Sequence, residues 1–111
     1  MGKYMVLYRS PVSTAEQMNV TPEQAKAGMD LWTAWSHQAG STLLDFGMPL
    51  GEGKHVTQDR ANKSRADIRG YSIVEAGSLD EAVTLVKDHP HFHTPGGASI
   101  EVLEFVPIPG M

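Results

Sequence analysis

HPHFHTPGGASIEVLEF, residues 89 to 105, is the stretch that decides the fold. It begins with three histidines at alternate positions, passes through a Pro-Gly-Gly turn and continues into a run that is apolar on both faces. Successive side chains of a strand point to opposite faces, so Ile100 and Val102 share one face while Leu103 and Phe105 share the other. The second half of the stretch is therefore predicted to be the last strand of a sheet that is covered on both sides.

Length and composition indicate one cysteine-free domain. The 111 residues suit a single domain over residues 1–111. The absence of Cys excludes disulfides and thiol chemistry. The net charge of -4 disfavours nucleic acid and anionic membranes as partners, and no run approaches the roughly 18 apolar residues that span a bilayer. We expect a cytoplasmic protein, because the N-terminus also lacks the pattern of a signal peptide.

Hydrophobic periodicity predicts two helices among the strands. A long helix from Thr21 to Gly40 and a short one from Leu79 to about His89 both follow capping-box spacing. The most polar segment, residues 51–69, is rich in Lys and Arg and is predicted to hold a short hairpin. The main predicted strands cover residues 3–8, 41–50, 70–76 and 99–106.

This order of elements predicts an α+β fold of the ferredoxin-like kind. A βαββαβ chain forms a four-stranded antiparallel sheet with two helices on one face. Two helices cover only that face, yet the first and last strands are apolar on both faces. We therefore expect a homodimer through the open sheet face, with two sheets packed face to face as a dimeric α/β barrel.

Short motifs along the whole chain resemble one family. They are KYMVLY at 3–8, GYSIV at 70–74, SLDEA at 78–82, DHP at 88–90, and GG with SIEV at 96–102. In this order and spacing the chain resembles the YCII-related family of small dimeric α/β-barrel proteins. The resemblance implies a ferredoxin-like homodimer and, for some members, a lyase- or dehalogenase-type activity with a His–Asp pair at a cleft near the barrel mouth. The Asp-Gly-Pro-Phe segment of many members is replaced here by residues 57–62.

Two kinds of chemistry are open to the histidines. In the first, His89 acts as a general base and Asp45 or Asp59 orients it, because histidine titrates near neutrality. In the second, extended backbone places His89, His91 and His93 on one side, where they bind a divalent metal ion. The fourth ligand of that metal site is Asp45, Asp59 or Glu101. The sequence itself requires no cofactor.

A third hypothesis is a binding module without catalysis. A cleft between the long helix and the sheet would hold a small apolar or aromatic molecule near Trp32, Trp35, Tyr71 and Phe92. The chain has neither the glycine spacing of a phosphate-binding loop nor a serine nucleophile elbow. A small-molecule-binding homodimer and an enzyme are therefore both retained as hypotheses.

Overall fold

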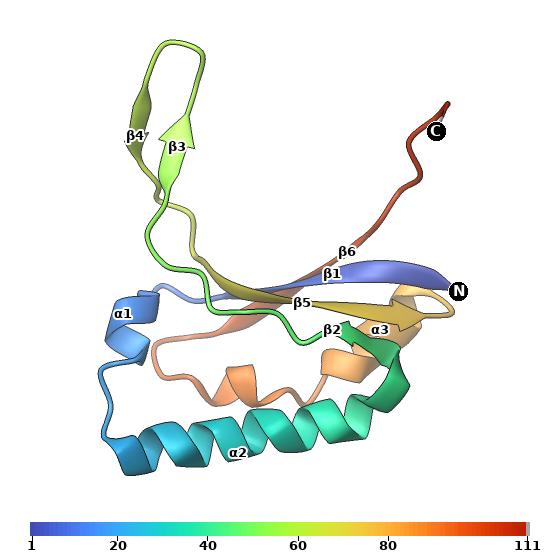
Figure 1. Ribbon diagram of the computed structural model, residues 1–111, viewed down its shortest axis with the longest axis horizontal. Coiled ribbons are helices and arrows are strands. Elements are labelled where there is room, and N and C mark those ends of the chain that lie inside the picture. The colour runs from blue at the N-terminus through green and yellow to red at the C-terminus, as the bar shows by residue number, and fades with distance from the viewer. Residues whose placement is uncertain (111) are drawn as a thin grey trace.

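The computed structural model describes residues 1–110 and contains one four-stranded antiparallel sheet (Figure 1). Its strands are β1 (Gly2–Arg9), β2 (Leu43–Asp45), β5 (Ile68–Ala76) and β6 (Ser99–Glu104). They lie in the order β2-β5-β1-β6, and every neighbouring pair is antiparallel. This interleaved order is that of a ferredoxin-like fold, so the predicted α+β class is confirmed.

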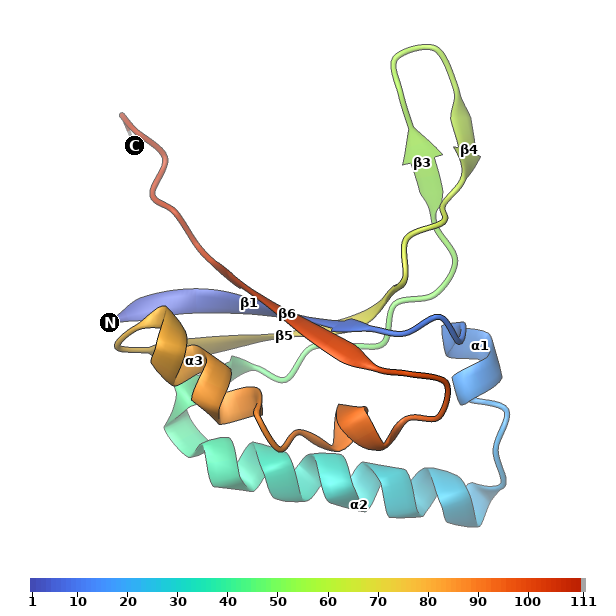
Figure 2. The same ribbon diagram turned by 180° about the vertical axis from the view of Figure 1, so that it is seen from behind.

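The helices lie on one face of the sheet (Figure 2). They are α1 (Thr14–Gln17), α2 (Pro22–Ala39) and α3 (Leu79–Val86), with 3-10 turns η1 (Gly40–Thr42) and η2 (Pro90–His93). The Thr21–Gln24 capping box forms as predicted, and Gly40 ends α2 at a φ of 59°. No helix in residues 1–110 is long and apolar enough to cross a membrane.

The core lies between the sheet and these helices. Alternate residues of β1, namely Tyr4, Val6 and Tyr8, are buried against the helices, and Val74 of β5 joins them. The other members of this cluster come from the helices and from the end of β5; they are Trp35, Ala39, Ala76, Ala82 and Val86. Because successive side chains of a strand point to opposite faces, the residues between these buried ones point to the other face of the sheet.

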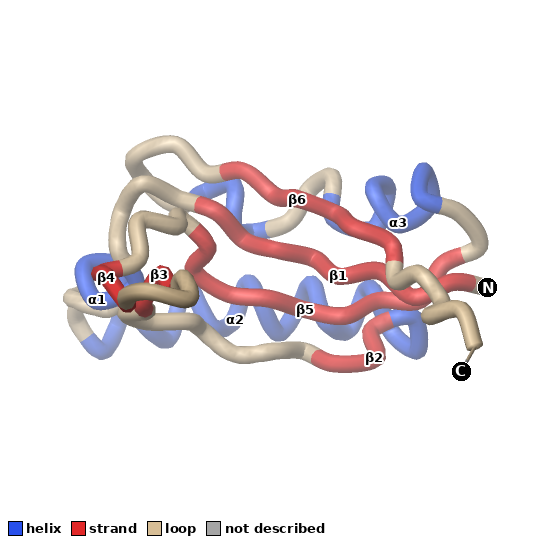
Figure 3. The backbone as a smooth tube through the Cα atoms, turned by 90° about the horizontal axis from the view of Figure 1, so that it is seen from above, coloured by secondary structure: helices blue, strands red, loops and turns tan. Residues whose placement is uncertain are grey.

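The opposite face of the sheet has no helix over it within the described chain (Figure 3). Its central side chains are apolar. Met5 of β1 pairs with Ile73 of β5 on one side and Leu103 of β6 on the other. The next row on this face contains Leu7 and Tyr71. We call these five side chains the open face.

Two segments rise on the open-face side, at opposite ends of the sheet (Figures 1 and 3). One is a separate two-stranded hairpin of β3 (Lys54–Val56) and β4 (Ala61–Lys63), in the polar segment where a hairpin was predicted. The other is the chain after β6, in which Val106 and Ile108 are exposed. Neither segment contributes to the buried core.

Two local predictions were wrong. The second strand was predicted over residues 41–50 but covers only Leu43–Asp45, because the pairing with β5 shifts there and Gly47 then takes a φ of 83°. The residues after His89 were predicted to be extended but form the turn η2. Pro90 occupies the first position of that turn, where its missing N–H is not needed.

Candidate functional site

A pocket of about 860 Å³ lies between α2 and the sheet. Its walls come from α1, the N-terminal half of α2, the loop after β2, the start of β5 and the chain after η2. The side chains that line it are mostly apolar, with aromatic rings among them; they include Tyr8, Val12, Met18, Met29, Trp32, Phe46, Met48, Pro49 and Pro95. A concave apolar site of this size suits a small organic molecule.

A chain of hydrogen bonds fixes the pocket wall beside the sheet. The Ser72 hydroxyl donates to the Phe46 carbonyl oxygen at 2.7 Å, so the Tyr8 hydroxyl, 2.7 Å from the Ser72 oxygen, must donate to it. Burial raises the pKa of Tyr8 to about 12, against the opposing effect of the Ser72 hydrogen bond. Tyr8 therefore stays protonated, and the hydrogen bond from Ser72 holds the Phe46 backbone against the sheet.

The polar side chains of the pocket are largely occupied by the protein itself. Arg69 donates from Nε to the Ser10 carbonyl oxygen at 2.9 Å, and Gln17 donates to the Val12 carbonyl oxygen at 2.9 Å. The Thr14 hydroxyl donates to the Leu50 carbonyl oxygen. These bonds attach the connection after β1 to the rest of the pocket wall.

His91 is the buried histidine of the pocket, with 2% of its surface exposed. Its Nε2 lies 2.9 Å from the Arg9 carbonyl oxygen and 3.1 Å from the Ser99 carbonyl oxygen. Arg9 and Ser99 are the last paired residues of β1 and β6 at this end of the sheet. His91 therefore links η2 to the sheet while its ring borders the pocket.

His89, the predicted general base, is fully buried and does not line the pocket. Its ring lies among Tyr8, Trp32 and Trp35, at centroid distances of 4.8, 4.5 and 4.2 Å. Its Nδ1 accepts the backbone N–H of His91 at 2.9 Å, so the neutral ring carries its proton on Nε2. Burial, and to a lesser degree the nearby His91, lowers the pKa of His89 to about 3. In this environment His89 is a neutral core residue.

The four predicted ligand-binding residues divide into two pairs. Trp32 lines the pocket, where the cleft was predicted, whereas Tyr71 borders it through its backbone because its side chain lies on the open face. Trp35 lies in the core, and its indole N–H donates to the Leu85 carbonyl oxygen at 3.0 Å. Phe92 is 46% exposed and does not line the pocket, because the turn η2 directs it away from the position that an extended chain would give it.

The predicted acidic partners of His89 lie elsewhere. Asp45 accepts the backbone N–H of Gly47 at 2.9 Å, and Asp59 lies in the turn of the hairpin, far from the helix layer (Figure 1). No hydrogen bond joins His89 to a carboxylate within residues 1–110. The expected His–Asp pair is therefore not formed by these residues.

The predicted row of three metal ligands is not formed in this arrangement of the backbone. It assumed an extended backbone, whereas His91 and His93 lie in η2. The proposed fourth ligand Glu101 instead accepts a hydrogen bond from Arg9 at 2.9 Å. Among the described residues, no group of three His, Asp or Glu side chains is arranged to hold a metal ion.

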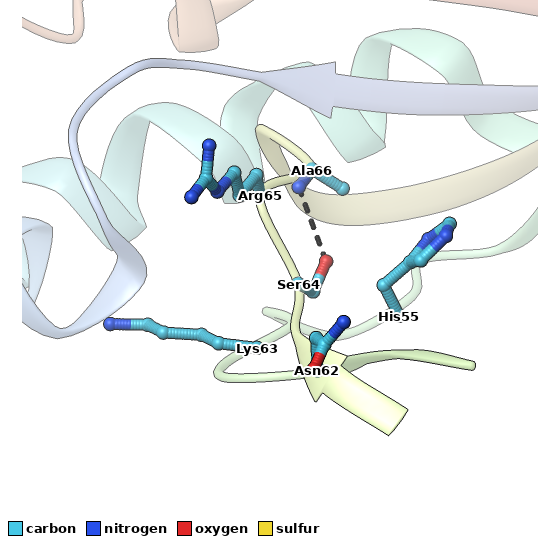
Figure 4. A pocket seen from close by; sticks show the side chains of 6 residues that line it. All are labelled: His55, Asn62, Lys63, Ser64, Arg65 and Ala66. Carbon is cyan, nitrogen blue, oxygen red and sulfur yellow. Dashed lines mark hydrogen bonds between the residues drawn. The ribbon is translucent and has the colours of Figure 1, made fainter. Parts of the chain in front are cut away.

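A second hollow, of about 840 Å³, lies at the hairpin (Figure 4). It is lined by His55, Asn62, Lys63, Ser64, Arg65 and Ala66. Ser64 accepts the Ala66 backbone N–H at 3.1 Å, and the side chains of Lys63 and Arg65 extend away from His55 (Figure 4). Nearly all of these residues are exposed, so we assign the candidate site to the α2–sheet pocket.

Several pocket residues were not singled out from the sequence. Val12 and Met18 belong to the connection between the first strand and the long helix, and Phe46 to a strand that ends earlier than predicted. The apolar side chains between the first strand and the long helix could have indicated that this connection packs against the rest of the protein. A fully solvated loop would expose them to water.

The fold is similar to that of a solved enzyme structure. This structure is the 5-chloro-2-hydroxyhydroquinone dehydrochlorinase (TftG) from Burkholderia phenoliruptrix AC1100, in complex with 2,5-dihydroxybenzoquinone. The likeness covers 94% of this chain and 93% of that chain, with a TM-score of 0.50 and 18% sequence identity. No protein-family model and no curated protein matches the sequence. At this identity the likeness establishes a shared small α+β fold.

Proposed function

We propose that this protein binds a small, largely apolar molecule in the α2–sheet pocket. The pocket itself carries this proposal: about 860 Å³ of concave surface is lined mainly by apolar and aromatic side chains. Large concave apolar pockets of this size are the usual form of small-molecule sites. The similar fold of a dehydrochlorinase in complex with a dihydroxybenzoquinone supports the choice of ligand size.

Gly28 offers a direct test of the pocket. It lies on the pocket-facing side of α2, and a Cβ placed on it would meet no atom within 4 Å. Gly28→Leu should therefore direct its side chain into the pocket from a Cβ that meets no atom, while the helix gains a residue with better helix propensity. We expect it to abolish the binding of uncharged aromatic compounds, 2-methoxynaphthalene among them, in isothermal titration calorimetry.

Ala27→Leu is the matched control. Ala27 is the preceding residue of α2, is exposed and does not line the pocket. It should keep wild-type affinity for each compound that binds. The proposal fails when no aromatic compound in the panel binds wild-type protein, or when Gly28→Leu binds as well as wild type does.

The functional unit that we propose is a homodimer joined through the open face. Met5, Leu7 and Leu103 would otherwise leave an apolar surface in water. The hairpin is basic, with Lys54, Arg60, Lys63 and Arg65 against Asp59, in a chain whose net charge is -4. A two-fold axis across the strands would bring this hairpin over the opposite end of a second sheet, where Glu75 lies on the open-face side near the end of β5. Membership of the YCII-related family, proposed from the motifs, agrees with this assembly.

A small lyase- or dehalogenase-type enzyme is the second candidate function. The observation that favours it is a histidine, His91, on the wall of an otherwise apolar pocket. It is the histidine best placed for acid–base work in the described chain, since His89 is enclosed by aromatic rings. Chloride release from 5-chloro-2-hydroxyhydroquinone tests this candidate, and the His91→Gln variant should release none.

A further inference from the structure

We propose that Nδ1 of His91 receives the hydroxyl proton of the molecule in the α2–sheet pocket, and that this molecule is an aromatic or enolic compound with an acidic hydroxyl group. The inference rests on the proposed small-molecule binding and adds the ligand class and the residue that selects it. It follows from the direction in which the protein holds the imidazole ring.

Both protein contacts of His91 Nε2 are with atoms that carry no proton. The carbonyl oxygens of Arg9 and Ser99 lie 2.9 and 3.1 Å from this nitrogen, so Nε2 must donate and must hold a proton. A neutral imidazole has only one N–H, and its other nitrogen is then an acceptor. The backbone therefore selects the tautomer in which His91 Nδ1 has a free lone pair.

His91 Nδ1 has no hydrogen-bond partner in the described chain. Within residues 1–110, the only fully buried side-chain nitrogen or oxygen without a hydrogen-bond partner is His89 Nε2. His91 Nδ1 also has no partner, so it must be accessible at least in part. His91 is 2% exposed and lines the pocket, so the pocket is where its Nδ1 meets solvent or a ligand.

The surroundings of His91 define the complementary ligand. Trp32 and Phe46 favour a flat apolar body, since aromatic rings pack well against one another. The buried Tyr8 hydroxyl is committed to Ser72, and Arg69 donates to backbone carbonyls. A ligand that satisfies His91 Nδ1 must itself supply a proton, which a hydroxyl group on the ring or on an enol does.

The proton transfer is simple and balanced. The ligand O–H bond breaks and its electron pair stays on oxygen, while the proton bonds to His91 Nδ1. The products are a ligand oxyanion and an imidazolium, with no change in total charge. The imidazolium keeps its Nε2–H toward the carbonyl oxygens of Arg9 and Ser99, whose partial negative charge stabilises it. Arg69, a cation on the same pocket wall, favours the oxyanion.

Two probes of nearly equal shape test the inference. 2-Naphthol carries a hydroxyl proton, whereas 2-methoxynaphthalene has a methyl group in its place. The variant is His91→Gln, because the glutamine amide can still donate to the two carbonyl oxygens but offers no acceptor at the Nδ1 position. His37→Gln is the matched control, since His37 is exposed on α2 and outside the pocket wall. Isothermal titration calorimetry gives the affinities.

We expect wild type and His37→Gln to bind 2-naphthol about five- to tenfold more tightly than His91→Gln does, the effect of one hydrogen bond. The affinity for 2-methoxynaphthalene should be the same in all three proteins. In addition, the ¹⁵N spectrum of the histidine rings should show His91 protonated at Nε2 in the free protein, with Nδ1 changing when 2-naphthol binds.

The outcomes separate this inference from the proposal on which it rests. Equal affinities of wild type and His91→Gln for 2-naphthol would overturn the inference while the pocket remains a binding site. Protonation of Nδ1 in place of Nε2 in the free protein would also overturn it. If neither probe binds wild-type protein, the proposed function is overturned and the inference falls with it.

Discussion

At the scale of single residues, His89 makes the stability of the protein depend on pH. Its pKa is lowered to about 3 in the folded state by burial, compared with about 6.5 in an unfolded chain. Above pH 6.5 neither state is protonated, so folding keeps its full stability. As the pH falls below 6.5, His89 becomes protonated in the unfolded chain but stays neutral in the folded protein until about pH 3. The free energy of unfolding therefore decreases over this range.

We expect the free energy of unfolding to fall by about 3 kcal/mol between pH 7.5 and pH 4.5 from this one group. Urea denaturation at the two pH values measures it. His89→Phe keeps an aromatic ring among Trp32 and Trp35 but cannot titrate. The fall in its free energy of unfolding between the two pH values should therefore be about 3 kcal/mol smaller than that of the wild type. A His89→Phe protein with the full wild-type decrease would contradict the assignment.

The Tyr8–Ser72 pair should respond unequally to the removal of its two hydroxyl groups. Tyr8→Phe leaves Ser72 with its bond to the Phe46 carbonyl oxygen, so we expect a loss of about 1 kcal/mol. Ser72→Ala leaves the buried Tyr8 hydroxyl and the Phe46 carbonyl without their partner, and should cost about 2 to 3 kcal/mol. Chemical denaturation of both variants gives the order, and a larger loss in Tyr8→Phe than in Ser72→Ala would contradict this arrangement of the two hydroxyl groups.

At the scale of elements, two glycines of the pocket wall should respond in opposite ways to alanine. Gly28 lies in α2 at a helical φ with open space beside it, so Gly28→Ala should stabilise the protein by about 0.5–1 kcal/mol. Gly47 follows β2 at a φ of 83°, and a Cβ there would overlap the Tyr71 carbonyl oxygen. Gly47→Ala should destabilise by about 3 kcal/mol or more. Melting temperatures of the two variants test the pair, and a neutral Gly47→Ala would mean that β2 and β5 can separate at little cost.

At the scale of the whole molecule, the open face should decide the oligomeric state. Leu103 lies at the centre of that face and is 50% exposed, while Leu31 on α2 is 54% exposed on the helix side. A charge at Leu103 would have to be desolvated between two sheets, so Leu103→Glu should give a monomer. Leu31→Glu, with nearly the same exposure, should leave a dimer. Analytical ultracentrifugation of the untagged proteins at micromolar concentration distinguishes these outcomes, and a monomeric wild type would refute the proposed assembly.

A site residue can be predicted from the sequence when the periodicity of its own helix or strand decides where its side chain points. It cannot be predicted when contacts with residues far away in the sequence decide this. Trp32 was found because the helix period places it toward the sheet. His89 and His91 could not be told apart in this way, because both are histidines next to Pro90. Only the turn η2 buries the first among aromatic rings and turns the second toward the pocket.

The sequence by itself determined the fold class, the faces of the strands and the caps of α2 and α3, because period-two and helical patterns and capping boxes are properties of neighbouring residues. The tertiary structure alone decided which histidine borders the pocket and which nitrogen of it is free. Those facts depend on carbonyl groups of β1 and β6, which lie 82 and 8 residues away from His91 along the chain. Contacts of this kind leave no periodic pattern in the sequence.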